Sequence, residues 1–192
     1  TQPETSEQPE QPEGEEQTSA PQLAPQSAAI AVQADGVREI GTADELIQFA
    51  QEVNSGIGTN VDAVLTGDID LRGKNWTPIG KSSYYPYKGT FDGDGHTVTL
   101  TLNVTSGSAG LFATTGNGAV IKNLTVDADV TSNVASTSYG TAGLVGVAGY
   151  PLVLENCGVT GTIKNTSTSS NSGVYVGGLV GYLQDNLTLK NC

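Results

Sequence analysis

A sequence pattern occurs three times in the second half of this chain. Each copy contains a Gly-Leu pair and, further on, an aliphatic residue two positions before an asparagine. Both landmarks move by 33 residues to the second copy and by 35 residues to the third: the pairs begin at Gly110, Gly143 and Gly178, and the aliphatic residues are Ile121, Leu154 and Leu189. Because the two landmarks move together, the chain is built from repeated units.

The composition of the units favours strands over helices. They are rich in Val, Thr, Leu, Asn, Ser and Gly, and short apolar runs end at Gly or Asn. A helical repeat of this length would instead be rich in Ala, Glu, Lys and Leu. The pattern therefore predicts an all-β parallel β-helix, in which each coil pairs with the next through backbone hydrogen bonds.

The aliphatic–polar–Asn–apolar pattern predicts a corner in every coil. Strict alternation would place Ile121 and Leu124 on opposite faces of a strand, yet both are apolar. A bend between them lets both point inward, and Asn tolerates the left-handed conformation that such a bend needs. We therefore expect the corner asparagines to stack from coil to coil: Asn123, Asn156 and Asn191.

Two cysteines occupy the position of Leu124 in the next two coils. We expect Cys157 and Cys192 to face inward and to lie near the strand spacing of about 4.8 Å. That separation permits a disulfide, but a bond along the stack would strain its dihedral angle. We favour two reduced, buried thiols.

Looser units precede the three clear ones. Residues 90–102 resemble a coil in which Val98 matches Ile121, and residues 63–71 resemble the coil before that. Ahead of them, residues 42–54 have the apolar spacing of a helix, and Thr42 with Glu45 forms a capping box. We expect this helix to cover the open end of the solenoid.

The N-terminal stretch differs sharply from the rest. The first thirty residues contain five prolines, six glutamates and no basic residue, so we predict a disordered acidic linker over residues 1–35. The folded unit would then be 36–192. Because the repeat pattern stops within a unit at Cys192, we expect a solenoid that is truncated at its C-terminus. We expect it to contact the remainder of its own larger chain. The net charge of −12 argues against nucleic acid, and no apolar run predicts membrane insertion.

Several motifs in order give a resemblance to a known family. Trp76-Thr-Pro-Ile-Gly80, the segment 88–98 and the repeated Gly-Leu pairs resemble the GLUG-motif repeats of bacterial surface proteins, which include adhesin-like proteins and the non-catalytic part of IgA-specific metallopeptidases. The resemblance covers about residues 37–192. It implies a right-handed parallel β-solenoid on the cell surface and no particular ligand. Two departures are Asp94, where the family has Asn, and Ala113, where a closing Gly is expected.

Candidate catalytic groups are few. His96 is the one histidine, and the chain has neither a Gly-x-Ser-x-Gly elbow nor a His-Glu-x-x-His motif. Asp92 and Asp94 resemble the start of a calcium loop, but its later acidic ligands are missing, so we favour a glycine-rich turn. Asp68 and Asp70 flank a strand residue and are expected to be solvated. We expect no catalytic residues, no metal and no cofactor.

Aromatic residues gather around one loop. Trp76, Tyr84, Tyr85 and Tyr87 lie within twelve positions, and aromatic faces can stack on sugar rings. The alternative is that Trp76 and Tyr87 pack over the first coils while Tyr84 and Tyr85 stiffen the loop. We favour packing.

The sequence thus favours a non-catalytic, extracellular cell-surface module that acts as an adhesive or structural spacer. Its partners would be a glycan or protein of a host or of the cell wall. Two other functions remain open: a carbohydrate-binding module using the Tyr84–Tyr87 loop, and an accessory segment of a surface peptidase or glycosidase.

Overall fold

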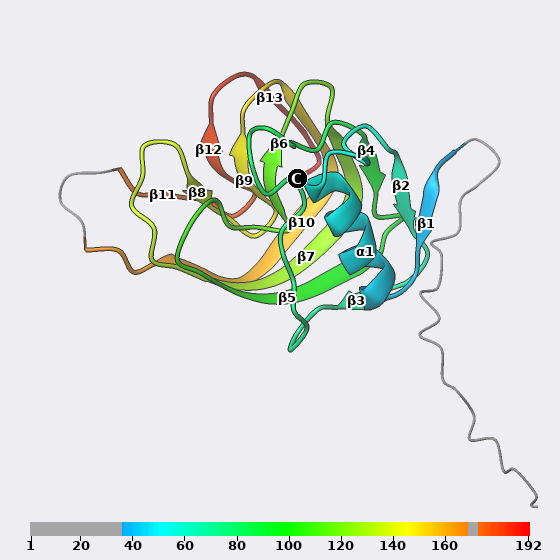
Figure 1. The fold of residues 1–192 in the computed structure, drawn as a ribbon, viewed down its shortest axis with the longest axis horizontal. Helices are drawn as coiled ribbons and strands as arrows, with labels where there is room; N and C mark the ends of the chain where they lie inside the picture. The colour runs from blue at the N-terminus through cyan, green and yellow to red at the C-terminus, as the bar shows by residue number, and fades with distance from the viewer. Residues whose placement is uncertain (1–35, 169–172) are drawn as a thin grey trace, which may run out of the picture.

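The computed structural model describes residues 36–168 and 173–192 (Figure 1). The stretch predicted to be a disordered linker, residues 1–35, lies outside the described residues. Among those described, one helix and thirteen strands form, in this order: β1 Arg38–Ile40, α1 Ala43–Asn54, β2 Ala63–Leu65, β3 Ile69–Asp70, β4 Thr90–Asp92, β5 Thr97–Val104, β6 Phe112–Thr115, β7 Val120–Ser132, β8 Gly140–Thr141, β9 Val145–Ala148, β10 Leu152–Asn165, β11 Tyr175–Val176, β12 Val180–Leu183 and β13 Leu187–Lys190.

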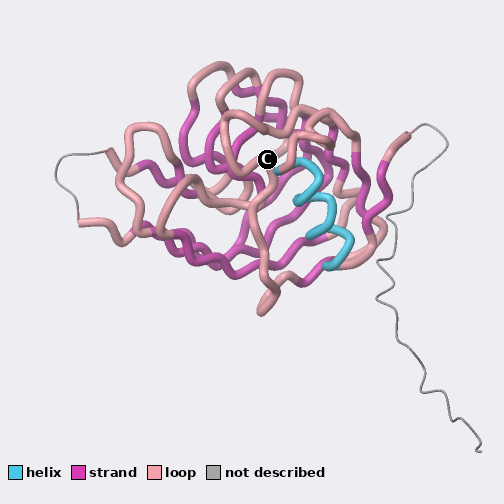
Figure 2. The backbone as a smooth tube through the Cα atoms, viewed as in Figure 1, coloured by secondary structure: helices cyan, strands magenta, loops and turns pink. Residues whose placement is uncertain are grey.

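The fold is mostly β, and the strands are joined by loops of very different length (Figure 2). The largest sheet has the order β1-β2-β4-β7-β10-β13, and β3 and β5 extend it beside β7. Two smaller sheets have the orders β12-β9-β6 and β11-β8. The strand pairs of the described residues are parallel. Figure 1 shows β5, β7 and β10 along the lower side and β6, β9 and β12 along the upper side.

The strand register follows the offsets of the sequence pattern. Leu154 of β10 pairs with Ile121 of β7 on one side and with Leu189 of β13 on the other. An offset of 33 or 35 residues therefore moves the chain from one strand to the neighbouring strand of the same sheet. β6, β9 and β12 follow the same progression in the smaller sheet.

The expected match between Val98 and Ile121 is wrong. Val98 pairs with Val126, and Ile121 pairs with Phe91 instead. The corner of the earlier coil holds residues 93–96, where β7 holds only residues 123–124. The glycines of that corner allow a longer turn between the two paired stretches. The sequence alignment did not allow for the extra residues of this turn, so it matched the wrong positions.

The helix begins as the sequence predicts. The hydroxyl of Thr42 accepts the backbone N–H of Glu45 at 3.3 Å, and the Glu45 carboxylate accepts the backbone N–H of Thr42 at 2.9 Å, which confirms the capping box. Leu46, Phe49 and Val53 are buried on one face of α1. Burial of that face, more than the propensity of a single short helix, stabilises α1.

An aromatic cluster joins α1 to the first strands. The ring of Phe49 lies 5.9 Å from that of Tyr87 and 6.3 Å from that of Phe91, and Phe112 of β6 continues the cluster at 5.3 Å from Phe91. All four rings are fully buried. The buried residues of α1 belong to the same hydrophobic core as those of β2, β4 and β6, so the helix packs against the first strands (Figure 1).

Candidate functional site

The corner asparagines form a continuous hydrogen-bonded column. Asn123, Asn156 and Asn191 have φ values of 52°, 52° and 51°, as the predicted left-handed corner requires. The side-chain amide of Asn191 donates to Oδ1 of Asn156 at 3.1 Å, and that of Asn156 donates to Oδ1 of Asn123 at 2.8 Å. The predicted stack is confirmed, and we call these three residues the asparagine column.

Asp92 ends the asparagine column. Its Oδ1 accepts the side-chain amide of Asn123 at 3.0 Å and the backbone N–H of Asp94 at 2.9 Å. Burial raises the pKa of the Asp92 carboxyl, but the bonds from Asn123, Asp94 and Lys122 outweigh it, and the pKa lies below its ordinary value. Asp92 is therefore a structural acceptor.

Charges alternate in the position just before the corner. Asp92, Lys122, Glu155 and Lys190 are register partners in successive strands. Lys122 Nζ lies 2.9 Å from Asp92 Oδ2, and Lys190 Nζ lies 3.4 Å from Glu155 Oε2. Opposite charges directly across neighbouring strands favour this register over a shifted one. We call these four residues the charge column.

The other acidic candidates also have structural partners. Asp68 accepts the backbone N–H of Thr97 at 2.8 Å, and this bond is the main reason that its pKa is lowered. His96 Nδ1 lies 3.4 Å from Asp68 Oδ1. Hydrogen bonds from the Arg72 side chain lower the pKa of Asp70 to about 2. Among the described residues, no group of three or more His, Cys, Asp or Glu side chains is placed to hold a metal ion.

The two cysteines differ from the expectation in one respect. Both are free, and Cys157 is buried as expected, but Cys192 is exposed. Burial raises the pKa of the Cys157 thiol to about 11. Cys192 follows β13, which within the described residues has a partner strand on one side only. On its other side, in the part of the chain that is described, Cys192 therefore lacks the neighbouring strand that helps to bury Cys157.

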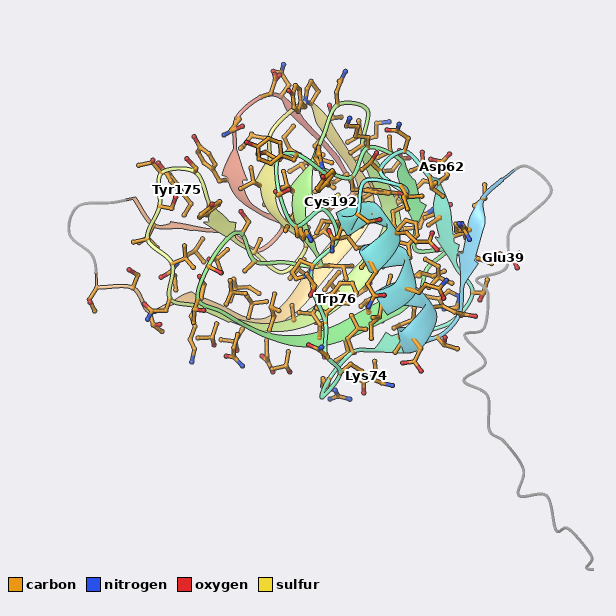
Figure 3. All side chains as sticks on the ribbon, in the orientation of Figure 1. Glu39, Asp62, Lys74, Trp76, Tyr175 and Cys192 are labelled. Atoms are coloured by element: carbon orange, nitrogen blue, oxygen red, sulfur yellow. The ribbon has the colours of Figure 1, made fainter. Side chains whose placement is uncertain are left out.

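The four aromatic residues singled out from the sequence do not form one surface. Tyr87 is fully buried in the aromatic cluster, and Trp76 is 8% exposed and lies beside α1 (Figure 3). The Tyr85 ring lies against Gly56, just after α1, and is 41% exposed. Tyr84 alone is highly exposed. The structure thus bears out the packing of Trp76 and Tyr87.

A groove brings Tyr84 together with residues that the sequence did not point to. It has a volume of about 520 Å³ and is lined by β6, β9 and the loops beside them. We call it the tyrosine groove; its lining includes Tyr84, Tyr139 and Tyr150, with Lys81, Ser108 and Thr115. Phe112 and Val145 of the same two strands belong to the core instead. Tyr139 and Tyr150 carry no motif, so no signal in one sequence would have paired them with Tyr84.

None of the described residues forms a helix that is long and apolar enough to cross a bilayer.

Comparison with known proteins gives two similarities. No family model matches the chain. The sequence is 33% identical to Halomucin from Haloquadratum walsbyi over an alignment of length 128, which covers 64% of this chain and 1% of that protein. The structure of a putative immunoglobulin A1 protease from Bacteroides ovatus superposes with a TM-score of 0.55 and 18% identity, over 79% of this chain and 54% of that one. At that identity the likeness shows a shared fold.

Proposed function

We propose that residues 36–192 form a right-handed parallel β-solenoid that serves as a non-catalytic module of an extracellular surface protein. The observation that carries the proposal is the asparagine column, in which each unit repeats the same contact with the next. A stack of this kind keeps its cross-section and lengthens with every unit. Its primary role is that of a structural or adhesive spacer.

Apart from the exposed thiol of Cys192, the side chains singled out as candidates for chemistry have partners in the fold. The Asp92 carboxylate is paired with Lys122 and Asn123, and the thiol of Cys157 is buried with a raised pKa. His96 has only the exposed carboxylate of Asp68 beside it, without a nucleophile in hydrogen-bond reach in the described structure. General acid–base or nucleophilic catalysis needs such groups free and directed at a cleft. This supports a non-catalytic module.

The similarities support an extracellular location. Likeness to Halomucin and to the Bacteroides ovatus protein is in keeping with a surface-protein module, and the motifs resemble the GLUG repeats of bacterial surface proteins. Labelling of intact cells with an antibody raised against residues 36–192 tests this directly. Labelling that requires permeabilised cells would contradict an extracellular location.

The spacer role can be tested by adding units. We would insert three further copies of residues 143–177 after position 177. Each copy should add one strand to every sheet, because this segment contains β9, β10 and β11. The particle should lengthen by about 14 Å, because parallel strands lie about 4.8 Å apart. Small-angle X-ray scattering measures the longest dimension. A longer chain that gains no length, or that gains disordered mass, would contradict the solenoid.

A second function is favoured by one observation. The Bacteroides ovatus structure carries the name of a protease, so a role as accessory segment of a surface peptidase is the main rival. The complete reading frame that encodes this chain separates the two. A metallopeptidase or glycosidase domain in the same frame would favour the accessory role, whereas further repeats alone would favour the spacer.

A further inference from the structure

The tyrosine groove has the size of a ligand site. Its volume of about 520 Å³ falls in the range of pockets that hold small molecules. Segments far apart in the chain meet in it, since Tyr84 follows the first coils, Tyr139 follows β7 and Tyr150 follows β9. The sheet strands β6 and β9 form its floor through Thr114, Thr115 and Val147. Three loops on a rigid floor provide a preformed concave surface.

The rim of the tyrosine groove is aromatic and accessible. Tyr84 is 87% exposed, Tyr150 is 53% exposed and Tyr139 is 46% exposed. Exposed apolar surface that gathers in one place marks an interaction site, because a bound partner removes it from water. Tyrosine presents a flat apolar face together with a hydroxyl, which suits the alternating C–H and O–H groups of a sugar ring.

The tyrosine groove is lined mainly by polar, uncharged side chains. Hydroxyl groups of Ser82, Ser83, Ser108 and Ser138 line it, with the amide of Gln184. The lining contains no carboxylate, although the whole chain carries a net charge of −12. Lys81 is its one charged residue, and no ion pair holds the Lys81 ammonium within the described residues.

From these observations we propose that the tyrosine groove is a carbohydrate-binding site, in which tyrosine rings stack on sugar rings and the serine hydroxyls and Gln184 amide of the lining bond to sugar hydroxyls. The site differs from the loop that the sequence suggested, because it uses Tyr84, Tyr139 and Tyr150 and leaves out Tyr85, Tyr87 and Trp76. Binding occurs without hydrolysis, since glycosidases need a pair of carboxylates and the groove contains none. The spacer would thus also be an adhesin for glycans.

A peptide is the other class of occupant. Peptide grooves use either an exposed strand edge or an apolar channel with pockets for side chains. The tyrosine groove lies over β6 and β9. β9 pairs with a strand on each side, and β6 pairs with β9 on one side and with Ile79 and Tyr87 through single bridges on the other. The lining carries hydroxyl groups. These features favour a glycan.

Binding to an array of neutral and carboxylated oligosaccharides, followed by titration calorimetry with the strongest binder, tests the proposal. The full chain is used. Tyr84→Ala should weaken binding about tenfold, the upper range for loss of one aromatic stack, and Tyr84→Phe should bind nearly as well as the wild type. Tyr85→Ala is the matched control, since Tyr85 is adjacent in sequence but lies outside the groove, and it should leave affinity unchanged.

The thermal unfolding midpoint of each variant separates binding from folding. Tyr84 is 87% exposed, so Tyr84→Ala should leave the midpoint unchanged while oligosaccharide affinity falls. The proposal is overturned if no oligosaccharide of the array binds, if Tyr84→Ala binds as tightly as Tyr85→Ala, or if only peptides bind.

Discussion

The side-chain amide of Asn156 donates to Oδ1 of Asn123 at 2.8 Å, and both residues have a φ of 52°. Two properties of asparagine are used at once in this contact. Its backbone tolerates the left-handed conformation of the corner, and its amide both donates and accepts along the stack. The same contact recurs between Asn191 and Asn156.

Substitution at Asn123 should separate those two properties. Asn123→Ala should lower the free energy of unfolding by about 2 kcal/mol, because a left-handed alanine is strained and two side-chain hydrogen bonds are lost. Asn123→Gly removes the hydrogen bonds but not the permissive backbone, so it should cost about 1 kcal/mol less. Urea denaturation measures both. Equal losses would mean that the left-handed backbone contributes nothing.

The charge column should respond to charge reversal. Lys122→Glu places three carboxylates in register with one another, Asp92 and Glu155 included, and should destabilise the fold by about 0.5 to 1 kcal/mol. Added salt should reduce that loss. Lys164→Glu is the matched control, since Lys164 is exposed on β10 and makes none of the ion pairs found in the described structure. A loss that salt does not change would contradict an electrostatic origin.

Acid should weaken the fold partly through Asp92. The folded-state pKa of Asp92 lies below its ordinary value of 3.8, so the ionised carboxylate contributes stability above that pH. This contribution is lost as the pH falls through the lower folded value. Urea midpoints measured between about pH 5 and about pH 2 should therefore fall more steeply for the wild type than for Asp92→Asn. Parallel curves would show that folding does not lower the pKa of Asp92.

The two thiols should differ in reactivity. Cys157 is buried with a pKa raised to about 11, whereas Cys192 is exposed. Because the thiolate is the reacting form, iodoacetamide at mildly alkaline pH should label Cys192 rapidly and Cys157 only after denaturation. Peptide mass spectrometry locates the label. Rapid labelling of native Cys157 would mean that the stack opens readily at β10.

Alternation along β5 should decide where a charge is tolerated. Leu100 is 1% exposed and faces the core, so Leu100→Lys should destabilise the fold by at least about 3 kcal/mol, the cost of a buried, unpaired charge. Thr101→Lys, one residue on, lies on the exposed face opposite Asp129 and should be close to neutral. Thermal unfolding compares the two variants. Similar losses would indicate a different register.

Local patterns in the sequence were sufficient for the parts of the fold that depend on near neighbours. The capping box of α1 needs only Thr42 and Glu45, three residues apart. The corner follows from the backbone preference of asparagine, and its repetition predicts the pairing of Ile121 with Leu154. Even so, the register predicted for Val98 was wrong, because the longer turn before it displaced the alignment.

Only the tertiary structure decided which side chains meet in the tyrosine groove. Tyr84 lies before β4, Tyr139 between β7 and β8, and Tyr150 between β9 and β10, and their convergence depends on how these loops lie beside β6 and β9. Burial is likewise a property of the stack, which is why Trp76 and Tyr87 became core residues and Cys192 stayed exposed. By itself, the sequence determined the repeating backbone, because hydrogen-bonded corners are encoded locally, whereas the surface between coils is set by contacts between residues distant in the chain.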